Sequence, residues 1–362
     1  LGPTFNSNSC GGCHIKNGRG LPQLGQALIR TSLPASSGSP VVTAEGVVPD
    51  PILGAQLQDS AVYGKQPEAN VAITWKETTD HYADGETYSL RSPQITLTPT
   101  DSQQPISPAL LTSLRIPPPV FGVGLLEAIP ASTLAAISDP DDQNKDGISG
   151  RINRVWNLET KRIDVGRFGL KANSATLLAQ TAAAYAHDMG IANPLLPNTD
   201  GTTEIDRETL EASAFYTQTL AVPARAQTDD PTIQKAVKRG ERLFANANCT
   251  ACHISVVKTG PASIKALSNQ TIQPYSDLLL HDMGKGLADG RPDFEADGQE
   301  WRTAPLWGLG LTHTVLPYAG YLHDGRARSI EEAILWHGGE AEAAKQAFMM
   351  MDQAIAKPFS SF

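Results

Sequence analysis

The sequence predicts a mainly α-helical protein of two similar domains, with long loops and a small β insertion in the first domain. Three observations support this fold class. The chain has 362 residues, about two domains at roughly 150 residues each. A five-residue motif, C-x-x-C-H, occurs at residues 10–14 and again at 249–253. Helical periodicity recurs along the chain, and 31 glycines and 26 prolines indicate that loops separate the helices.

The composition excludes two classes of partner. Lys and Arg number 29 against 38 Asp and Glu, so the net charge of -9 does not suit binding to a nucleic-acid backbone. No run approaches the roughly 18 apolar residues that a membrane-spanning helix needs. The chain opens without a basic and then apolar leader, so we expect any signal peptide to have been removed or to lie outside this sequence.

The duplicated motif is typical of covalent haem attachment. Two thiols three positions apart can reach the two vinyl groups of one porphyrin, and the adjacent imidazole can coordinate its iron. A zinc site would place its second Cys pair roughly 12 to 20 residues after the first, and neither a disulfide nor a thioredoxin-like pair needs the histidine. We therefore expect two covalently bound haem c groups. The residues concerned are Cys10, Cys13, His14, Cys249, Cys252 and His253.

Each motif indicates one cytochrome c-like domain. We expect the first domain at residues 1–222 and the second at 231–362, joined by a linker rich in Pro and Asp. Covalent attachment needs an oxidising compartment, so a bacterial protein of this kind is expected to be periplasmic or secreted. Strands are expected at 71–75 and 87–91, where prolines at 93 and 99 limit their length. Helices are expected at 108–115, 131–138, 174–188, 205–221, 231–245, 330–337 and 340–356.

His337 is the best candidate for a further iron ligand. Ser329 and Glu332 form a capping box, and the helix that they start places His337 on the same face as the apolar residues of 330–334. A single His on an apolar face is also often a plain core residue. Met189 and Met283, each in a His-Asp-Met-Gly sequence, are interpreted mostly as packing residues, with iron ligation as the alternative.

Glu127 is a candidate proton carrier. It is the only charged residue in the apolar run 119–130, and a buried carboxyl suits proton transfer. The alternative is a structural carboxylate, at a helix start or paired with Arg115. Trp156 and Trp301 are weaker candidates for a residue between the two haems, because a Trp is more often part of the core.

Residues 142–148 follow the pattern D-x-N-x-D-G-I of calcium-binding loops. The side-chain oxygens of Asp142, Asn144 and Asp146 would bind the ion together with the carbonyl of Ile148. The twelfth loop position holds Asn153 instead of the usual Glu. An Asp-rich turn without a metal ion is the alternative.

Several segments resemble the bacterial di-haem oxidoreductases, a group of peroxidase-like or thiol-oxidoreductase-like proteins related to the di-haem cytochrome c peroxidases. The resemblance implies that the distal ligand of the second haem lies on the helix after His-Asp-Gly-Arg, where this chain has His337 and relatives have Met or Tyr. The catalytic Trp-Asp-Gly-Arg segment of the peroxidases is not recognisable, and Glu127 is its substitute by position only. The segments lie at 121–130, 146–151, 166–169, 281–284, 301–307 and 323–326.

These observations predict a di-haem oxidoreductase of the peroxidase type. The haem on His14 would bind peroxide, Glu127 would move the proton, and the haem on His253 and His337 would relay electrons. The donor would be a small soluble cytochrome or cupredoxin, and the acidic composition favours one with a basic patch. The alternatives are an electron-transfer cytochrome without catalysis, and an oxidase of a thiol or protein substrate.

Overall fold

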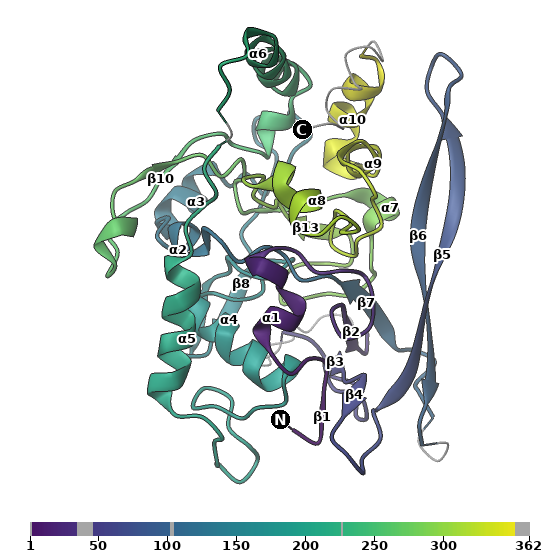
Figure 1. The fold of residues 1–362 in the computed structure, drawn as a ribbon, viewed down its shortest axis with the longest axis vertical. Coiled ribbons are helices and arrows are strands. Elements are labelled where there is room, and N and C mark those ends of the chain that lie inside the picture. Colours follow the sequence, from purple (N-terminus) through teal and green to yellow (C-terminus); the bar gives the residue numbers. More distant parts are fainter. Residues whose placement is uncertain (1, 35–45, 102–104, 226, 352–362) are drawn as a thin grey trace.

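The computed structural model describes residues 2–34, 46–101, 105–225 and 227–351. Helices and small sheets form the body of the molecule, and a long two-stranded ribbon stands along one side (Figure 1). Helix accounts for 28% and strand for 22% of the chain. The prediction of a mainly α-helical protein is therefore wrong. The prediction missed many short strands. These strands form by pairing between distant segments, and they are too short to show a periodic pattern in the sequence.

The helices are short apart from two. The helices of the described residues are α1 (Cys10–Cys13), α2 (Val123–Glu127), α3 (Ala131–Ile137), α4 (Leu177–Ala183), α5 (Arg207–Thr219), α6 (Pro231–Asn246), α7 (Gly284–Leu287), α8 (Thr312–Val315), α9 (Ile330–Leu335) and α10 (Glu342–Met349). A π-helical turn at Ala184–Asp188 continues α4. Within this part of the chain, no helix is both long enough and apolar enough to cross a membrane.

The strands form one three-stranded sheet, in the order β3-β2-β7, and several two-stranded antiparallel pairs. The pairs are β1 with β4, β5 with β6, β8 with β9, β10 with β11 and β12 with β13. Their bounds are β1 (Thr4–Phe5), β2 (Leu28–Ser32), β3 (Gln56–Leu57), β4 (Ser60–Ala61), β5 (Ala69–His81), β6 (Thr87–Pro99), β7 (Leu111–Arg115), β8 (Arg154–Asn157), β9 (Arg162–Val165), β10 (Val257–Lys258), β11 (Thr271–Ile272), β12 (Leu280–Asp282) and β13 (Glu300–Arg302).

The β insertion is a ribbon of two 13-residue strands, β5 and β6. It runs from the first half of the chain to α9 in the second half (Figure 1). The guanidinium group of Arg91 lies 4.2 Å from the ring centre of Trp75 and donates a hydrogen bond to the Arg326 carbonyl. Pro93 is tolerated within β6 because a two-stranded ribbon leaves alternate N–H groups unpaired. The expected strands are confirmed and are longer than predicted.

Most of the predicted helices are confirmed. The segments 131–138, 174–188, 205–221, 231–245 and 330–337 match α3, α4 with its π turn, α5, α6 and α9. The segment 340–356 contains α10, and its last five residues lie outside the described part of the chain. The helix predicted at 108–115 is wrong, because residues 111–115 form β7 and pair along the whole of β2. Tertiary pairing overrides the local pattern there.

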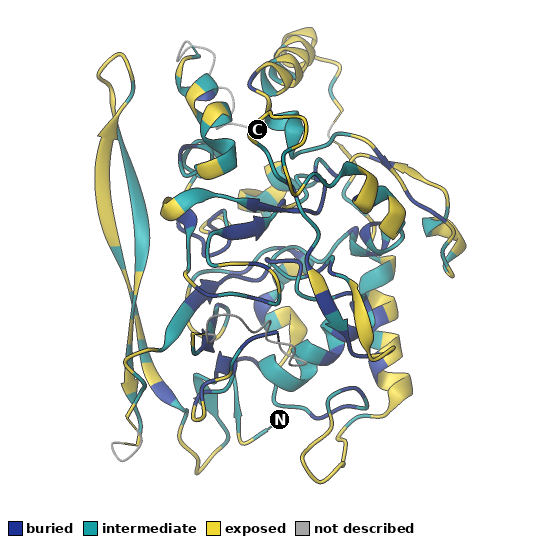
Figure 2. Ribbon diagram, turned by 180° about the vertical axis from the view of Figure 1, so that it is seen from behind, coloured by how far each residue is buried: buried dark blue, intermediate teal, exposed yellow. Residues whose placement is uncertain are grey.

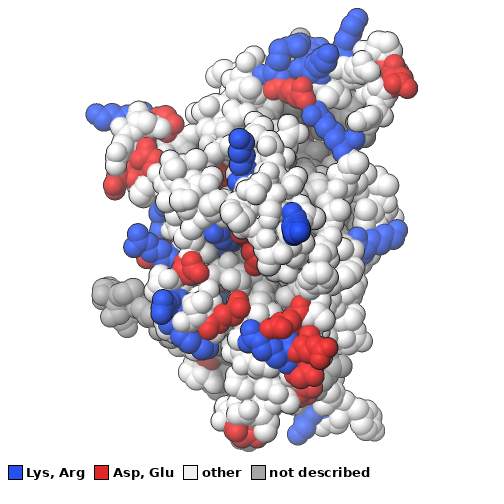
Figure 3. Space-filling view, turned by 90° about the vertical axis from the view of Figure 1, so that its left-hand side faces the viewer, with Lys and Arg blue, Asp and Glu red and all other residues white. Residues whose placement is uncertain are grey.

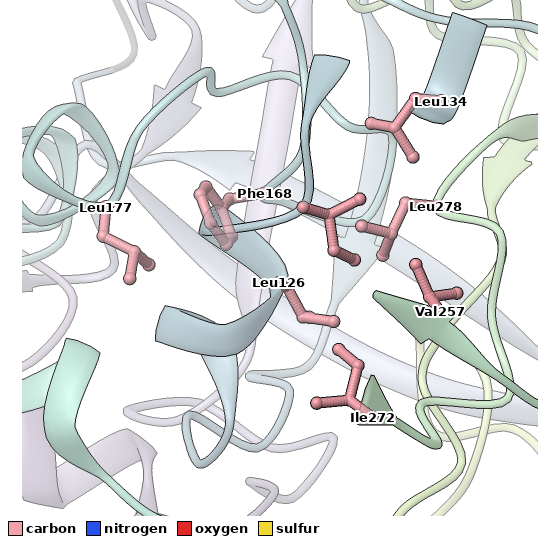
Figure 4. Packing of buried hydrophobic residues seen from close by; sticks show 8 residues of the cluster. Leu126, Leu134, Phe168, Leu177, Val257, Ile272 and Leu278 are labelled. Carbon is pink, nitrogen blue, oxygen red and sulfur yellow. The ribbon is translucent and has the colours of Figure 1, made fainter. Parts of the chain in front are cut away.

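The two halves of the chain share a hydrophobic core. Leu126, Phe168 and Leu177 from the first half pack with Val257 and Ile272 from the second (Figure 4). Buried residues are concentrated where the halves meet and are sparse on α6 and the ribbon (Figure 2). A division into domains at 222–231 remains a prediction.

Candidate cofactor cavity

One cavity of about 2230 Å³ lies between the two halves of the chain. A pocket for a single small ligand reaches roughly 1,000 Å³, so this volume suits two large groups. All seven residues predicted to bind haem line it, namely Cys10, Cys13, His14, Cys249, Cys252, His253 and His337. The structure therefore brings together two motifs that are far apart in the sequence. None of the four cysteines forms a disulfide.

The first motif forms the short helix α1 and the residue after it. The Ser9 hydroxyl caps α1 by accepting a hydrogen bond from the Gly12 N–H. His14 donates from Nδ1 to the Pro118 carbonyl at 2.8 Å. Burial lowers the pKa of His14. The ring is therefore neutral near pH 7, and its Nε2 lone pair is available to a metal ion.

The second motif follows α6 and has the same arrangement. His253 donates from Nδ1 to the Tyr275 carbonyl at 2.8 Å. Burial lowers the pKa of His253 to about 4. The ring of Phe244, at the end of α6, lies with its centre 6.0 Å from that of His253. Both predicted proximal histidines thus have the fixed tautomer that iron ligation requires.

His337 follows α9, whereas the second motif follows α6. The Ser329 hydroxyl accepts from the Glu332 N–H, so the predicted cap is confirmed. His337 donates from Nδ1 to the Ala333 carbonyl at 2.7 Å, and burial lowers its pKa. It is close enough to His253 to lower the pKa of that ring further, after burial. The structure therefore brings two neutral imidazoles to the same part of the cavity.

Partly buried arginines along the cavity suit the carboxylates that a haem carries. Burial lowers the pKa of both Arg19 and Arg302 to about 10. Both residues line the cavity; Arg19 Nη1 donates to the Leu322 carbonyl, and Arg19 Nε has no hydrogen-bond partner among the described residues. A buried cation with an unused donor indicates that an anionic group belongs beside it. The thiols, imidazoles and guanidinium groups together fit haem.

Of the weaker candidates, Met189, Met283 and Trp301 line the cavity. Trp301 stacks on His323 with ring centres 3.7 Å apart, and the Lys171 ammonium lies 4.5 Å from its ring centre. Trp156 belongs to a hydrophobic cluster around α4 and α5 and is not a lining residue in the described part of the chain.

Glu127 lies at the end of α2, where its carboxylate has two hydrogen bonds. Oε1 accepts from the Leu177 N–H and Oε2 from Gln218 Nε2, both at 2.7 Å. The first bond caps α4, and the second holds α5. Among the described residues, Glu127 is not part of the cavity lining.

The predicted calcium loop is exposed and closed by its own hydrogen bonds. The Asp146 N–H donates to Asp142 Oδ1 at 3.0 Å and to Asn144 Oδ1 at 2.9 Å, so these oxygens converge. Gly147 has φ 83°, a left-handed conformation that favours glycine. The Ile148 N–H donates to Asp146 Oδ1. Calcium binding remains a prediction.

Two groups of titratable side chains were missed by the sequence analysis. His281 donates to Asp277 at 2.8 Å and to Glu340 at 2.7 Å. Burial opposes its charge, but these bonds outweigh it and raise the pKa of His281 to about 12. Asp188 lines the cavity near Cys10, and burial raises the pKa of its carboxyl, against the effect of Arg30. The repeated His-Asp-Met-Gly sequence was the available signal, and only its methionines were considered.

Comparison with protein families matches the chain twice, over residues 51–206 and 197–360, to one family described as di-haem oxidoreductase, putative peroxidase. The second match contains the motif at 249–253, and the motif at 10–14 lies before the first match. The two matches fit a repeated organisation. No curated protein and no solved structure matches the chain. Because the matched residues cover well over half of the sequence, the resemblance is confirmed: the chain belongs to the di-haem oxidoreductase family and is an oxidoreductase that uses haem.

Proposed function

We propose that this oxidoreductase carries two covalently attached haem c groups and reduces peroxide. Cys10 and Cys13 would attach the first haem, with His14 as its iron ligand, and Cys249 and Cys252 the second, with His253. The support is their common position in one cavity of sufficient volume. Thioether formation needs reduced thiols in an otherwise oxidising compartment, which favours the periplasm or the cell exterior.

The difference between the two ends of the cavity carries the peroxidase assignment. His337 is among the groups that lower the pKa of His253, whereas the causes of the lowered pKa of His14 are burial and backbone hydrogen bonds, with no imidazole among them. When bound, each haem would supply an iron that exchanges electrons, and an iron with one free position would also bind peroxide. His337 would close the second iron, and the first would stay accessible.

The chain itself would supply a proton carrier near the first motif. Glu127 remains the candidate from the sequence, and Asp188 is an alternative because it lines the cavity and its raised pKa suits proton transfer. Arg19 and Arg302 would hold the haem carboxylates. Trp301, stacked on His323, would lie between the two ends of the cavity as an electron relay.

The calcium loop would act on stability. A calcium ion on Asp142, Asn144 and Asp146 would fix the segment before Arg151, whose guanidinium group is paired with Glu300 of the second half. Binding to the folded chain alone would raise its stability by mass action.

An optical and EPR titration with cyanide tests the peroxidase assignment. The ferric wild type is expected to show one low-spin haem and one high-spin or labile haem. Cyanide should shift the spectrum of the high-spin or labile haem only. His337→Ala should open the other iron, so that cyanide shifts both. His81→Ala, at an exposed ribbon position, is the matched control and should behave as the wild type. A wholly low-spin protein that ignores cyanide, before and after partial reduction, would refute the proposal.

The second candidate function is electron transfer without catalysis. Met189 favours it, because this thioether lines the cavity and could close the first iron. Oxidation of a thiol substrate has less support, since all four cysteines lie in the two motifs. Met189→Ala separates the first two: it should leave the spin state unchanged in a peroxidase and produce a new high-spin signal in a carrier.

A further inference from the structure

Helix α6 (Pro231–Asn246) has an unusual charge for this protein. Four of its 16 residues are cationic and only Glu241 is acidic, a net charge of +3 in a chain whose other residues sum to -12. Glu241 is itself paired with Arg225 at 2.6 Å. Lys and Arg side chains gather at the top of the molecule, where α6 stands in Figure 1 (Figure 3).

The cations form one continuous row. They are Lys235, Lys238, Arg239 and Arg242, all of them exposed. Spacings of three and four residues place side chains on the same helix face. The row covers about 10 Å of helix, close to the Debye length of roughly 8 Å at physiological salt. The four charges therefore act together on an approaching molecule, whereas acidic groups on distant faces are screened.

The opposite face of α6 is turned to the cavity. Its apolar residues Ala236, Val237, Leu243 and Phe244 line the cavity, and Phe244 lies against His253. Arg239, at the edge of the basic row, also lines the cavity, whereas the other three cations of the row do not. Lys235, Lys238 and Arg242 are thus separated from the second motif by about one helix diameter, roughly 10 Å. An amphipathic helix that binds a lipid surface inserts its apolar face, and here that face lines the cofactor site. A soluble partner fits the exposed row better than a membrane does.

We propose that the basic row of α6 is the docking surface of the electron donor, and that the donor is a small one-electron carrier protein with an acidic face around its redox centre. This inference rests on the proposed function and names its partner more closely. It reverses the expectation of a basic donor, which was based on net charge alone. In each encounter the reduced carrier would give up one electron, and the group that His253 would hold would accept it.

The test is stopped-flow reduction of the haem-loaded protein by a basic cytochrome c and by the same cytochrome with its lysines succinylated, which makes it acidic. Lys235→Glu with Lys238→Glu reverses half of the row. Lys65→Glu with Lys76→Glu changes the net charge equally at exposed positions on and beside the ribbon. At low salt the acidic donor should react faster with the wild type, and the α6 variant should be slower by about 10-fold or more. The control variant should change its rate by less than about 2-fold.

Three results would overturn the proposal: a wild type that prefers the basic donor, equal losses in both variants, or no loss in the α6 variant. If instead anionic phosphatidylserine vesicles sediment the wild type but not the α6 variant, and the donor rates are equal, the row binds lipid. Haem content is measured first, and Lys235→Gln with Lys238→Gln replaces the charge reversal if that variant loses haem. Neutral hydroquinone can serve as an electron donor for peroxide turnover without docking on α6. Absence of peroxide turnover with hydroquinone would therefore count against the proposed function and leave the docking proposal untouched.

Discussion

Replacing Lys171 by Met should destabilise the protein by about 3–5 kcal/mol, the cost of breaking a buried ion pair. The Lys171 side chain is fully buried. Its ammonium group donates to Asp289 Oδ1 at 2.8 Å and to the carbonyls of Arg291 and Asp297 at 2.7 Å. Methionine has a similar volume and none of these bonds. Two carbonyls would lose their donor, each at a cost of roughly 1–3 kcal/mol. Asp289 would keep Arg115 at 3.4 Å as its ion-pair partner and the Arg291 N–H at 3.0 Å as a hydrogen-bond donor.

Urea denaturation of the haem-loaded protein, followed by circular dichroism, measures this loss. With an m value of roughly 3 kcal/mol/M, the midpoint should fall by about 1 M or more. Arg207→Ala removes an exposed pair with Glu211 and should cost about 0–1 kcal/mol. Lys171→Arg should not restore stability, because a planar guanidinium group cannot place three donors as the ammonium does. Equal midpoints for Lys171→Met and Arg207→Ala would refute the assigned role of the buried pair.

Three further predictions concern single groups. The pKa of His281 rises from 6.5 to about 12 on folding, so its charge stabilises the protein fully below pH 6.5 and progressively less above it. The difference in unfolding free energy between the wild type and His281→Gln should therefore shrink as the pH rises. A difference that grows between pH 6.5 and 9 would contradict this. Chelation of calcium should lower the midpoint of thermal unfolding, and Asp146→Ala should lower it equally at unchanged haem content. An unchanged midpoint in protein shown to be free of metal would count against calcium binding. Asp188→Asn should slow peroxide turnover by about 100-fold with unchanged ferric spectra, and a loss confined to Glu127→Gln would assign the proton to Glu127.

The residues that share a motif could be predicted from the sequence because short spacings fix their chemistry. Cys249, Cys252 and His253 need no knowledge of the fold to be recognised, and the cap at Ser329 correctly predicted where α9 begins. In each case the relevant partners lie within about one helical turn. The structure then shows that these local units line one cavity.

The features that depend on distant contacts could not be predicted. Residues 111–115 have no local signal that separates a strand from a helix, and β2 decides between them. For Glu127 the sequence left a proton carrier and a structural carboxylate as alternatives, and two elements about 50 and 90 residues later donate to both of its oxygens. Lys171 looks like any surface lysine until Asp289 is placed beside it. Long-range pairing leaves no periodic pattern in the sequence.

Mass spectrometry of the denatured protein tests the central claim most directly. Two covalent haems require that the unfolded chain keep the mass of both groups after extraction with acid acetone. Cys13→Ala and Cys252→Ala should each weaken attachment of one haem, and replacing both cysteines of a motif should remove that haem's mass. A wild-type chain that loses all its haem on denaturation, or retains only one, would contradict the account.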